Sequence, residues 1–164
     1  MVNEELKMKI TELLPAAVFE EGGEWINIAI APAEWKPLAT QLRHKDDLAF
    51  DFLFCVTCVD WKTHLGMVYH LTSTKYRHNL VIKIKLDRTL PRIETVADIW
   101  RTAEFNEREA YEMFGIEFDG HPDLLRLLTI EEFDGFPLRK DYPLLGKAEI
   151  IAGHEGGVQW RKRD

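Results

Sequence analysis

Two cysteines have the spacing of a metal site. Cys55 and Cys58 form a Cys-x-x-Cys pair, and His64 and His70 follow closely enough to complete four ligands. The surrounding sequence alternates like a β-strand, in which side chains three positions apart point to opposite faces. The two thiols should therefore diverge, and the sequence contains no second Cys-x-x-Cys pair. We predict two core cysteines that hold neither zinc nor an iron–sulfur cluster.

Two further residues are candidates for acid–base chemistry. Glu107 lies on the apolar face of a predicted helix, where a carboxylate must be paired, hydrogen-bonded or protonated. His121 lies in a Gly-His-Pro turn, with no nucleophile beside it in the sequence. Their chemical roles would be catalytic acid and general base. We favour structural roles: a buried ion pair of Glu107 with Arg139 or Arg126, and a turn histidine bonded to backbone.

A charged turn near the C-terminus is the third candidate. Arg139-Lys140-Asp141 can form an anion site or an intermolecular salt bridge, and it can equally be a solvated turn. Residues 153–157 match neither a phosphate-binding loop nor a dinucleotide fingerprint. The sequence also lacks the Gly-x-Ser-x-Gly and His-Glu-x-x-His motifs of hydrolases. The residues by themselves therefore indicate no active site.

The elements that must position these residues predict an α+β fold. Helical spacing and strand alternation give the order αββαβββα, with helices packed on a mainly antiparallel sheet. Both faces of the strand at 48–61 are apolar, which indicates a central strand covered on both sides. The last helix covers 95–114, either unbroken from a capping box of Thr95 and Asp98 or restarted at Asn106.

Regular periodicity stops after Ile116, so we divide the chain into an α+β domain at 1–116 and an extended, irregular segment at 117–164. Two Gly-x-Pro bends fix the course of the segment. Its apolar side chains without periodicity are typical of a segment that lies along a partner and is ordered by it. We predict that truncation near Gly120 leaves a soluble domain but abolishes assembly. The expected contacts are Leu124, Leu127, Phe136, Leu138 and Tyr142, with Arg139 and Lys140 fixing the register.

Composition excludes several classes of protein. The 164 residues are 46% hydrophobic and carry a net charge of −7, which argues against a general nucleic-acid binder. No apolar run approaches the roughly 20 residues that span a bilayer. The acidic first residues lack the features of a signal peptide, so we expect a cytosolic protein that reaches a membrane only through partners.

Four motifs follow one another between Asn106 and Leu144: Glu107-Arg108-Glu109, Phe114-Gly115-Ile116, Gly120-His121-Pro122-Asp123-Leu124 and Pro137-Leu138-Arg139-Lys140-Asp141-Tyr142-Pro143. Together they resemble the C, or thirty-kilodalton, subunit of proton-pumping NADH:quinone oxidoreductase (complex I). Two positions depart from the family pattern. Leu125 stands where a second arginine is usual, and Phe136 stands where a histidine is common. The family motif, which we interpret as an interaction site, comprises Glu107, Arg108, Glu109, Phe114, Gly115, Gly120, His121, Pro122, Asp123, Leu124, Arg126, Pro137, Leu138, Arg139, Lys140, Asp141, Tyr142 and Pro143.

The resemblance implies a non-catalytic structural subunit of the peripheral arm, on the cytoplasmic side of the cell membrane. Its partners would be the quinone-site (D, forty-nine-kilodalton) subunit and neighbouring peripheral-arm subunits. The whole complex uses FMN, iron–sulfur clusters, NADH and quinone, whereas this chain is expected to bind no cofactor. Two alternatives stay open: the equivalent subunit of a membrane-bound hydrogenase or ferredoxin-linked relative, and a stand-alone hydrolase using Glu107 and His121.

Overall fold

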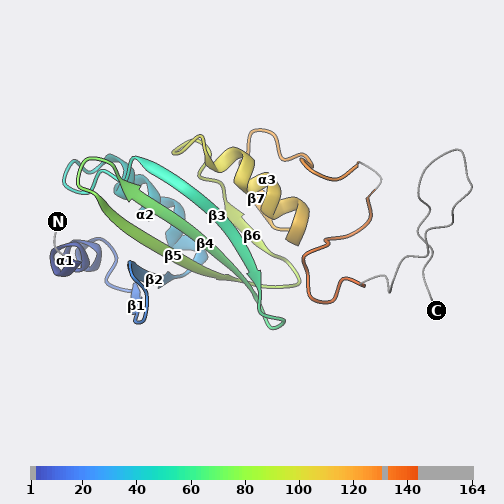
Figure 1. Ribbon diagram of the computed structural model, residues 1–164, viewed down its shortest axis with the longest axis horizontal. Helices are drawn as coiled ribbons and strands as arrows, with labels where there is room; N and C mark the ends of the chain where they lie inside the picture. Colours follow the sequence, from blue (N-terminus) through green and yellow to red (C-terminus); the bar gives the residue numbers. More distant parts are fainter. Residues whose placement is uncertain (1–2, 131–132, 144–164) are drawn as a thin grey trace, which may run out of the picture.

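The computed structural model describes residues 3–130 and 133–143, and it has the predicted order of elements with two additions. Figure 1 shows an α+β arrangement of helices against a mainly antiparallel sheet, as predicted. The additions are β6 and β7, which periodicity did not indicate because each has only three residues. The elements are α1 (Asn3–Leu13), β1 (Val18–Glu20), β2 (Ile26–Ile30), α2 (Pro32–His44), β3 (Phe52–Asp60), β4 (Leu65–Ser73), β5 (His78–Leu86), β6 (Arg92–Glu94), α3 (Ala103–Phe114) and β7 (Glu117–Asp119).

The main sheet has the strand order β1-β2-β5-β4-β3, and β6 and β7 form a separate two-stranded sheet. The expected meander of β3, β4 and β5 is present, and each of its pairs is antiparallel. However, β2 and β5 pair in parallel, with Ile28 opposite Ile82. This pairing is possible because a long connection containing α2, β3 and β4 separates the two strands in the sequence.

The expectation that the strand at 48–61 is central was wrong. Among the described residues, β3 pairs only with β4 and forms an edge of the sheet. A bulge between Leu53 and Cys55 shifts the alternation, so Leu53 and Val56 are both buried. Phe52 and Phe54 consequently lie on the outer face and remain 43% and 38% exposed. Periodicity revealed an apolar strand, but it does not reveal how many neighbours a strand has.

Aromatic side chains join α2 to the sheet and to the segment before α3. The Trp35 ring on α2 lies 4.3 Å from the Tyr69 ring of β4 and 6.2 Å from the Trp100 ring, measured between centroids. Trp100 Nε1 donates a hydrogen bond of 2.9 Å to the carbonyl oxygen of Phe50. These contacts fix the residues before α3 on the same face of the sheet as α2, and α3 itself packs against β3.

The stretch before α3 is not helical, so the predicted capping box was wrong. The helix begins at Ala103, and Asp98 forms an ion pair with Lys36 of α2 instead of capping a helix.

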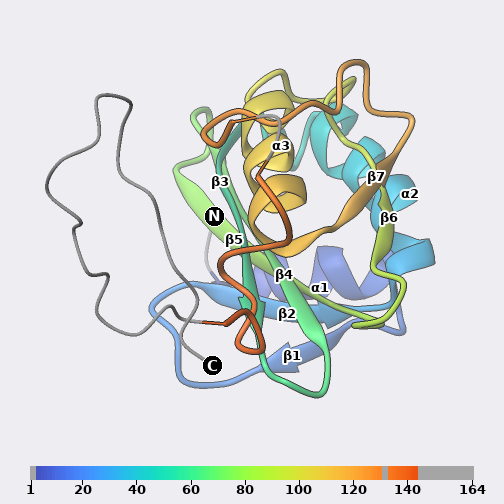
Figure 2. The same ribbon diagram turned by 90° about the vertical axis from the view of Figure 1, so that its right-hand side faces the viewer.

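Beyond α3, Ile116 and Phe118 are 0% and 3% exposed, and β7 pairs with β6. The regular core therefore continues past Ile116 to Asp119. Figure 2, turned by 90°, shows β6 and β7 beside each other next to α3.

Candidate functional site

The segment after β7 is held against the chain's own α3 by a carboxylate that the sequence analysis missed. Glu112 is fully buried, and its carboxylate accepts hydrogen bonds from the backbone N–H groups of Leu127 (2.7 Å), Leu128 (2.9 Å) and Thr129. Burial raises the pKa of Glu112, but the hydrogen bonds from Thr129 and the neighbouring backbone outweigh it and lower the pKa to about 2. Glu112 is thus an anion that fixes the backbone of 127–129.

A second anchor joins the end of β3 to the charged turn. The Asp60 carboxylate, 3% exposed, pairs with Arg88 at 2.8 Å and accepts the backbone N–H of Lys140 at 2.8 Å. Arg88 also pairs with Asp141 at 2.8 Å. The hydrogen bond from Arg88 holds the pKa of Asp60 well below its usual range despite burial. The sequence did carry a signal for Asp60, because it continues the buried face of Val56 and Cys58 and a buried charge needs a partner.

Of the three roles considered for Arg139-Lys140-Asp141, the solvated turn and the open anion site do not describe it, and the intermolecular salt bridge stays a prediction. The backbone N–H of Lys140 donates to the Asp60 carboxylate, and the Asp141 carboxylate accepts a hydrogen bond from Arg88. Arg139 Nε donates to the Phe114 carbonyl oxygen at 2.6 Å. The turn is therefore an internal docking element. It is neither freely solvated nor an open anion site.

A third anchor packs Phe136 on the end of α3. Gly115 ends the helix with a φ of +73°, and a Cβ atom there would lie 2.6 Å from the Phe136 ring. The Arg139 guanidinium lies 4.9 Å from the centroid of the same ring. Close approach of the ring thus requires glycine at position 115.

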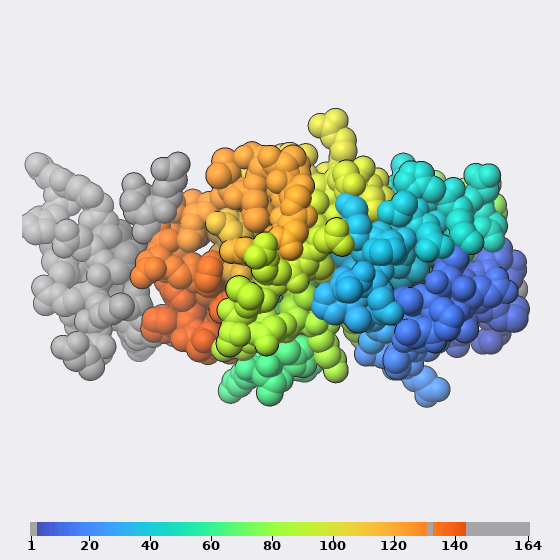
Figure 3. Space-filling model, turned by 180° about the vertical axis from the view of Figure 1, so that it is seen from behind, coloured from blue at the N-terminus to red at the C-terminus, as the bar shows by residue number. Residues whose placement is uncertain are grey.

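The described part of the tail is anchored on its own domain at three places, so the expectation that a partner must order it was wrong for these residues. Figure 3 shows the orange part of this segment packed against the green and yellow parts of the domain.

Glu107 is fully buried, but the predicted ion pair with Arg126 or Arg139 was wrong. Its carboxylate accepts hydrogen bonds from Thr95 Oγ1 and from the backbone N–H of Val96 at 2.9 Å. Burial raises the pKa of Glu107 to about 7, and the hydrogen bonds from Thr95 and Val96 only partly offset it. The two arginines contact Thr129 and Phe114 instead.

His121 has the predicted role of a turn histidine bonded to backbone. Its Nδ1 accepts the Asp123 backbone N–H at 3.1 Å, which assigns the ring proton to Nε2, and Nε2 donates to the Glu104 carbonyl oxygen at 3.0 Å. The same Nε2 lies 3.9 Å from the Glu107 carboxylate. The structure therefore brings Glu107 and His121 together, but both side chains are 0% exposed.

The remaining motif residues connect α3 to the turn that follows it. Arg108 donates to the carbonyl oxygens of Leu125 (2.9 Å) and Arg126 (3.1 Å), while Glu109 is exposed on the same helix. Leu124 packs against the core, and Leu138 is 54% exposed. The motif residues thus divide between internal anchors and surface side chains.

Cys55 and Cys58 show no features of a metal site. Burial raises the pKa of Cys58 to about 12 and also raises that of Cys55, so neither thiol is a ready thiolate ligand. Within 3–130 and 133–143, no three His, Cys, Asp or Glu side chains gather in the way a metal ion would need. The absence of a bound cofactor stays a prediction.

An exposed apolar row is the surface feature of the anchored segment. Leu125, Leu128 and Ile130 are 59%, 65% and 69% exposed, and Leu127 is 40% exposed. Phe105 of α3, 56% exposed, adds an aromatic ring beside Arg108. We call 125–130 the leucine row. Its backbone is held by Glu112 and Arg108 although its side chains point into solvent, which is unfavourable unless another surface covers them.

These features define a class: an α+β domain with an anchored C-terminal segment that presents apolar side chains. None of the described helices is both long enough and apolar enough to cross a bilayer. The family "Respiratory-chain NADH dehydrogenase, 30 Kd subunit" matches residues 28–148, which is most of the chain. The protein belongs to this family, as its motifs predicted.

Curated relatives have the corresponding names. The NADH-quinone oxidoreductase C subunit of Chloroherpeton thalassium is 44% identical over 110 residues, which cover 66% of this chain and 46% of the relative. The C subunit of Acidithiobacillus ferrooxidans is 43% identical over 117 residues, covering 65% of this chain and 58% of the relative. The C/D subunit of Phocaeicola vulgatus is 45% identical, covering 68% of this chain and 22% of the relative. The matches therefore span from about a fifth to somewhat over half of these relatives.

Two solved structures have the same fold. A trypsin-resistant fragment of Nqo5 superposes with a TM-score of 0.63 and 26% identity, covering 75% of this chain and all of the fragment. A chain of the membrane-bound sulfane sulfur reductase, an archaeal respiratory membrane complex, gives a TM-score of 0.75 and 25% identity, covering 87% of this chain and 86% of that chain.

Proposed function

We propose that this chain is a non-catalytic structural subunit of the peripheral arm of NADH:quinone oxidoreductase, and that it braces the quinone-site subunit. The observation that carries this proposal is the leucine row on a backbone fixed by the chain's own Glu112. A surface that is ordered before binding loses little conformational entropy on docking, so apolar contact contributes fully to affinity. The family membership and the relatives' names support the choice of complex.

The choice of the quinone-site subunit as the partner is supported by the Phocaeicola vulgatus relative. Its name combines the letters C and D, and this chain matches 22% of its length. A fused polypeptide keeps two parts close together, which suits two parts that pack against each other. In the proposed assembly the chain lies on the cytoplasmic side and meets the membrane only through partners. FMN, the iron–sulfur clusters, NADH and quinone are then bound by other subunits.

The stand-alone hydrolase is the weaker hypothesis. Glu107 and His121 are adjacent, but neither side chain is exposed, and the carboxylate is already occupied by Thr95 and Val96. A general acid or base must reach the proton that it transfers. A substrate cannot touch these atoms unless the turn at Gly120–Pro122 opens.

A second candidate function keeps the bracing role but changes the complex. The likeness to a chain of the archaeal sulfane sulfur reductase favours an equivalent subunit in a respiratory relative with another electron donor, such as a hydrogenase or a ferredoxin-linked enzyme. Membranes that contain the native complex should oxidise NADH with quinone if the first candidate is right. Oxidation of hydrogen or reduced ferredoxin, without NADH oxidation, would favour the second.

The bracing role is tested by charge substitution in the leucine row. We expect Leu128→Asp and Ile130→Asp each to lower co-purification of the quinone-site subunit from solubilised membranes at least about tenfold, because a carboxylate in an apolar interface loses its hydration. Met8→Asp is the matched control, since Met8 is 61% exposed on α1. Circular dichroism of each purified variant checks the fold. Retention of the quinone-site subunit by both row variants would contradict the proposal.

A further inference from the structure

His121 closes the turn that leads into the leucine row, and its two contacts require a neutral imidazole. Nδ1 accepts the backbone N–H of Asp123 at 3.1 Å, and Nε2 donates to the carbonyl oxygen of Glu104 at 3.0 Å. Both backbone groups have fixed roles, since an N–H can only donate and a carbonyl oxygen can only accept. A second proton on Nδ1 would face the Asp123 N–H donor to donor. Uptake of a proton by His121 must therefore break this contact.

The same turn joins the leucine row to the domain. The backbone N–H of Leu125 donates to the Asp123 carbonyl oxygen at 3.0 Å, and the Leu125 carbonyl oxygen accepts from Arg108 at 2.9 Å. Leu124, which lies between the turn and the row, packs against the core. Opening of the turn at Asp123 therefore loosens the first residues of the leucine row.

Glu107 cannot act as a counter-ion for a charged His121 in acid. Its carboxyl group lies 3.9 Å from Nε2 of the ring. Burial raises the pKa of Glu107 to about 7, whereas a histidine in water gains its second proton near pH 6.5. Acidification thus neutralises the carboxylate of the pair before it adds a positive charge. A buried imidazolium without a counter-ion is unfavourable, and opening of the turn lets water solvate it.

The other ionisable groups around the pair come from each neighbouring element. Lys36 of α2 pairs with Asp98, and the exposed Asp123 carboxylate lies 4.0 Å from Arg108. The set is completed by Glu104 of α3, Tyr69 of β4 and Asp119 of β7, which pairs with Arg92. The three aspartates thus already have cationic partners, and Glu107 is the acid beside the ring.

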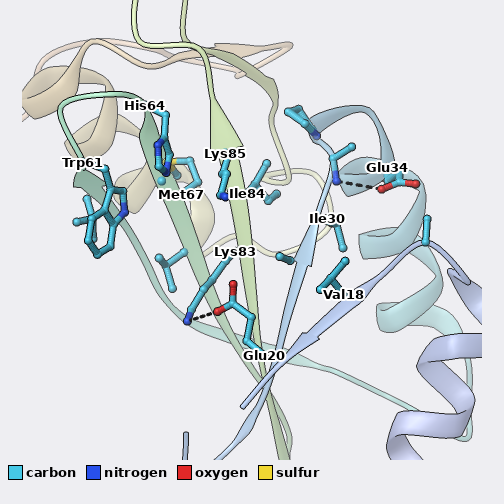
Figure 4. Close-up of a pocket in the computed structure, with 17 residues that line it drawn as sticks. Val18, Glu20, Ile30, Glu34, Trp61, His64, Met67, Lys83, Ile84 and Lys85 are labelled. Atoms are coloured by element: carbon cyan, nitrogen blue, oxygen red, sulfur yellow. Dashed lines mark hydrogen bonds and ion pairs between the residues drawn. The ribbon is translucent and has the colours of Figure 1, made fainter. Parts of the chain in front are cut away.

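The pair is closed off from the hollow on the outer face of the sheet. Figure 4 shows this hollow, of about 900 Å³, between Trp61 and Val18, and its lining includes neither Glu107 nor His121. Both side chains of the pair are 0% exposed. A proton therefore reaches Nδ1 when the turn itself opens.

We propose that His121 is a proton-sensitive latch of the leucine row: the neutral ring keeps the turn at 120–123 closed, and uptake of a proton opens the turn and weakens docking. The effect on docking rests on the proposed bracing function. Because the closed turn excludes the second proton, its stability is complete well above about pH 6.5 and is lost as the pH falls below that value. The sign is opposite to that of Glu107, whose protonation stabilises the folded state.

Hydrogen exchange at the Asp123 amide of the purified full chain tests the latch. Because opening takes up one proton, the protection factor should fall about tenfold between pH 7.5 and pH 5.5. His121→Asn should remove this dependence, since an asparagine oxygen accepts the N–H two residues on but does not titrate in this range. His44→Asn, at the exposed end of α2, is the matched control and should leave the dependence unchanged.

A third variant separates the two members of the pair. Glu107→Gln should keep the response to acid, because it replaces a group that is already neutral at pH 5.5. Loss of the response in Glu107→Gln, its persistence in His121→Asn, or equal protection of the wild type at both pH values would each overturn the inference. So would nitrogen NMR that shows an imidazolium at His121 at pH 5.5 while the Asp123 amide stays protected.

Docking is measured separately, by co-purification from solubilised native membranes. The wild type should retain the quinone-site subunit at least about threefold less at pH 5.5 than at pH 7.5, and His121→Asn should retain it equally at both. If Leu128→Asp loses the subunit as expected, equal retention by the wild type at the two pH values would overturn the inference. Retention by Leu128→Asp and Ile130→Asp would contradict the bracing alone, because exchange at Asp123 is measured without a partner.

Discussion

Removing the Glu112 carboxylate should release the segment that carries the leucine row without unfolding the domain. The carboxylate holds three backbone N–H groups, those of Leu127, Leu128 and Thr129. A hydrogen bond to a charged group contributes about 1.5–3 kcal/mol, but water can solvate the donors of a surface segment, so we take about 1 kcal/mol each. Glu112→Ala should therefore lower the free energy of opening of this segment by about 3 kcal/mol.

The variant Glu112→Gln should open the segment less easily than Glu112→Ala. In Glu112→Gln the amide oxygen can keep the Leu127 and Leu128 donors, while the amide NH₂ faces the Thr129 N–H as a second donor. Loss of the charge and of one hydrogen bond should cost about 2 kcal/mol. The measurement is hydrogen exchange at amides 127–129, where 3 kcal/mol corresponds to roughly hundredfold faster exchange. Glu109→Gln, on the exposed side of α3, is the control.

The pH dependence has a definite sign. Because the folded-state pKa of Glu112 is lowered from 4.5 to about 2, its stabilisation is complete above about pH 4.5 and is lost as the pH falls towards 2. Protection at 127–129, corrected for intrinsic exchange, should therefore decrease over that range in the wild type and stay flat in Glu112→Gln. Unchanged exchange at these amides in Glu112→Ala at neutral pH would refute the assignment of Glu112 as the anchor.

Three further predictions follow from the other buried groups. The pKa of Glu107 is raised from 4.5 to about 7, so the folded state binds the proton more tightly than the unfolded state. The free energy of unfolding should therefore fall by up to about 3 kcal/mol as the pH rises between these values. Urea titrations of Glu107→Gln should show no such pH dependence, and a pH dependence that persists would assign it to another group. Asp60→Asn should lower the free energy of unfolding by about 3 kcal/mol because Arg88 loses its buried partner, and a double-mutant cycle with Arg88→Met should show coupling. Gly115→Ala should lower the free energy of unfolding, measured by thermal unfolding, by about 2 kcal/mol. The control Gly22→Ala should lower it less, because Gly22 also has a positive φ but no atom lies near its Cβ position. Equal losses of stability in the two variants would exclude the Phe136 contact as the cause.

The sequence by itself determined the order of the main elements. Helical spacing identified the buried position of Glu107, and the Gly-His-Pro turn identified the backbone role of His121. These inferences succeed because burial periodicity and turn chemistry are local properties of a few consecutive residues. The ordered motifs between Asn106 and Leu144 likewise sufficed for the family.

Only the tertiary structure decided which groups meet. Glu107 is satisfied by Thr95 and Val96 rather than by an arginine, and the edge position of β3 depends on the pairing of strands that are distant in the chain. The two anchors that matter most for the proposed function, Glu112 and Asp60, bind backbone donors 15 to 17 and 80 residues away, respectively. A sequence pattern shows that a buried carboxylate needs a partner, but the partner is chosen by the three-dimensional packing of segments that local periodicity cannot relate to each other.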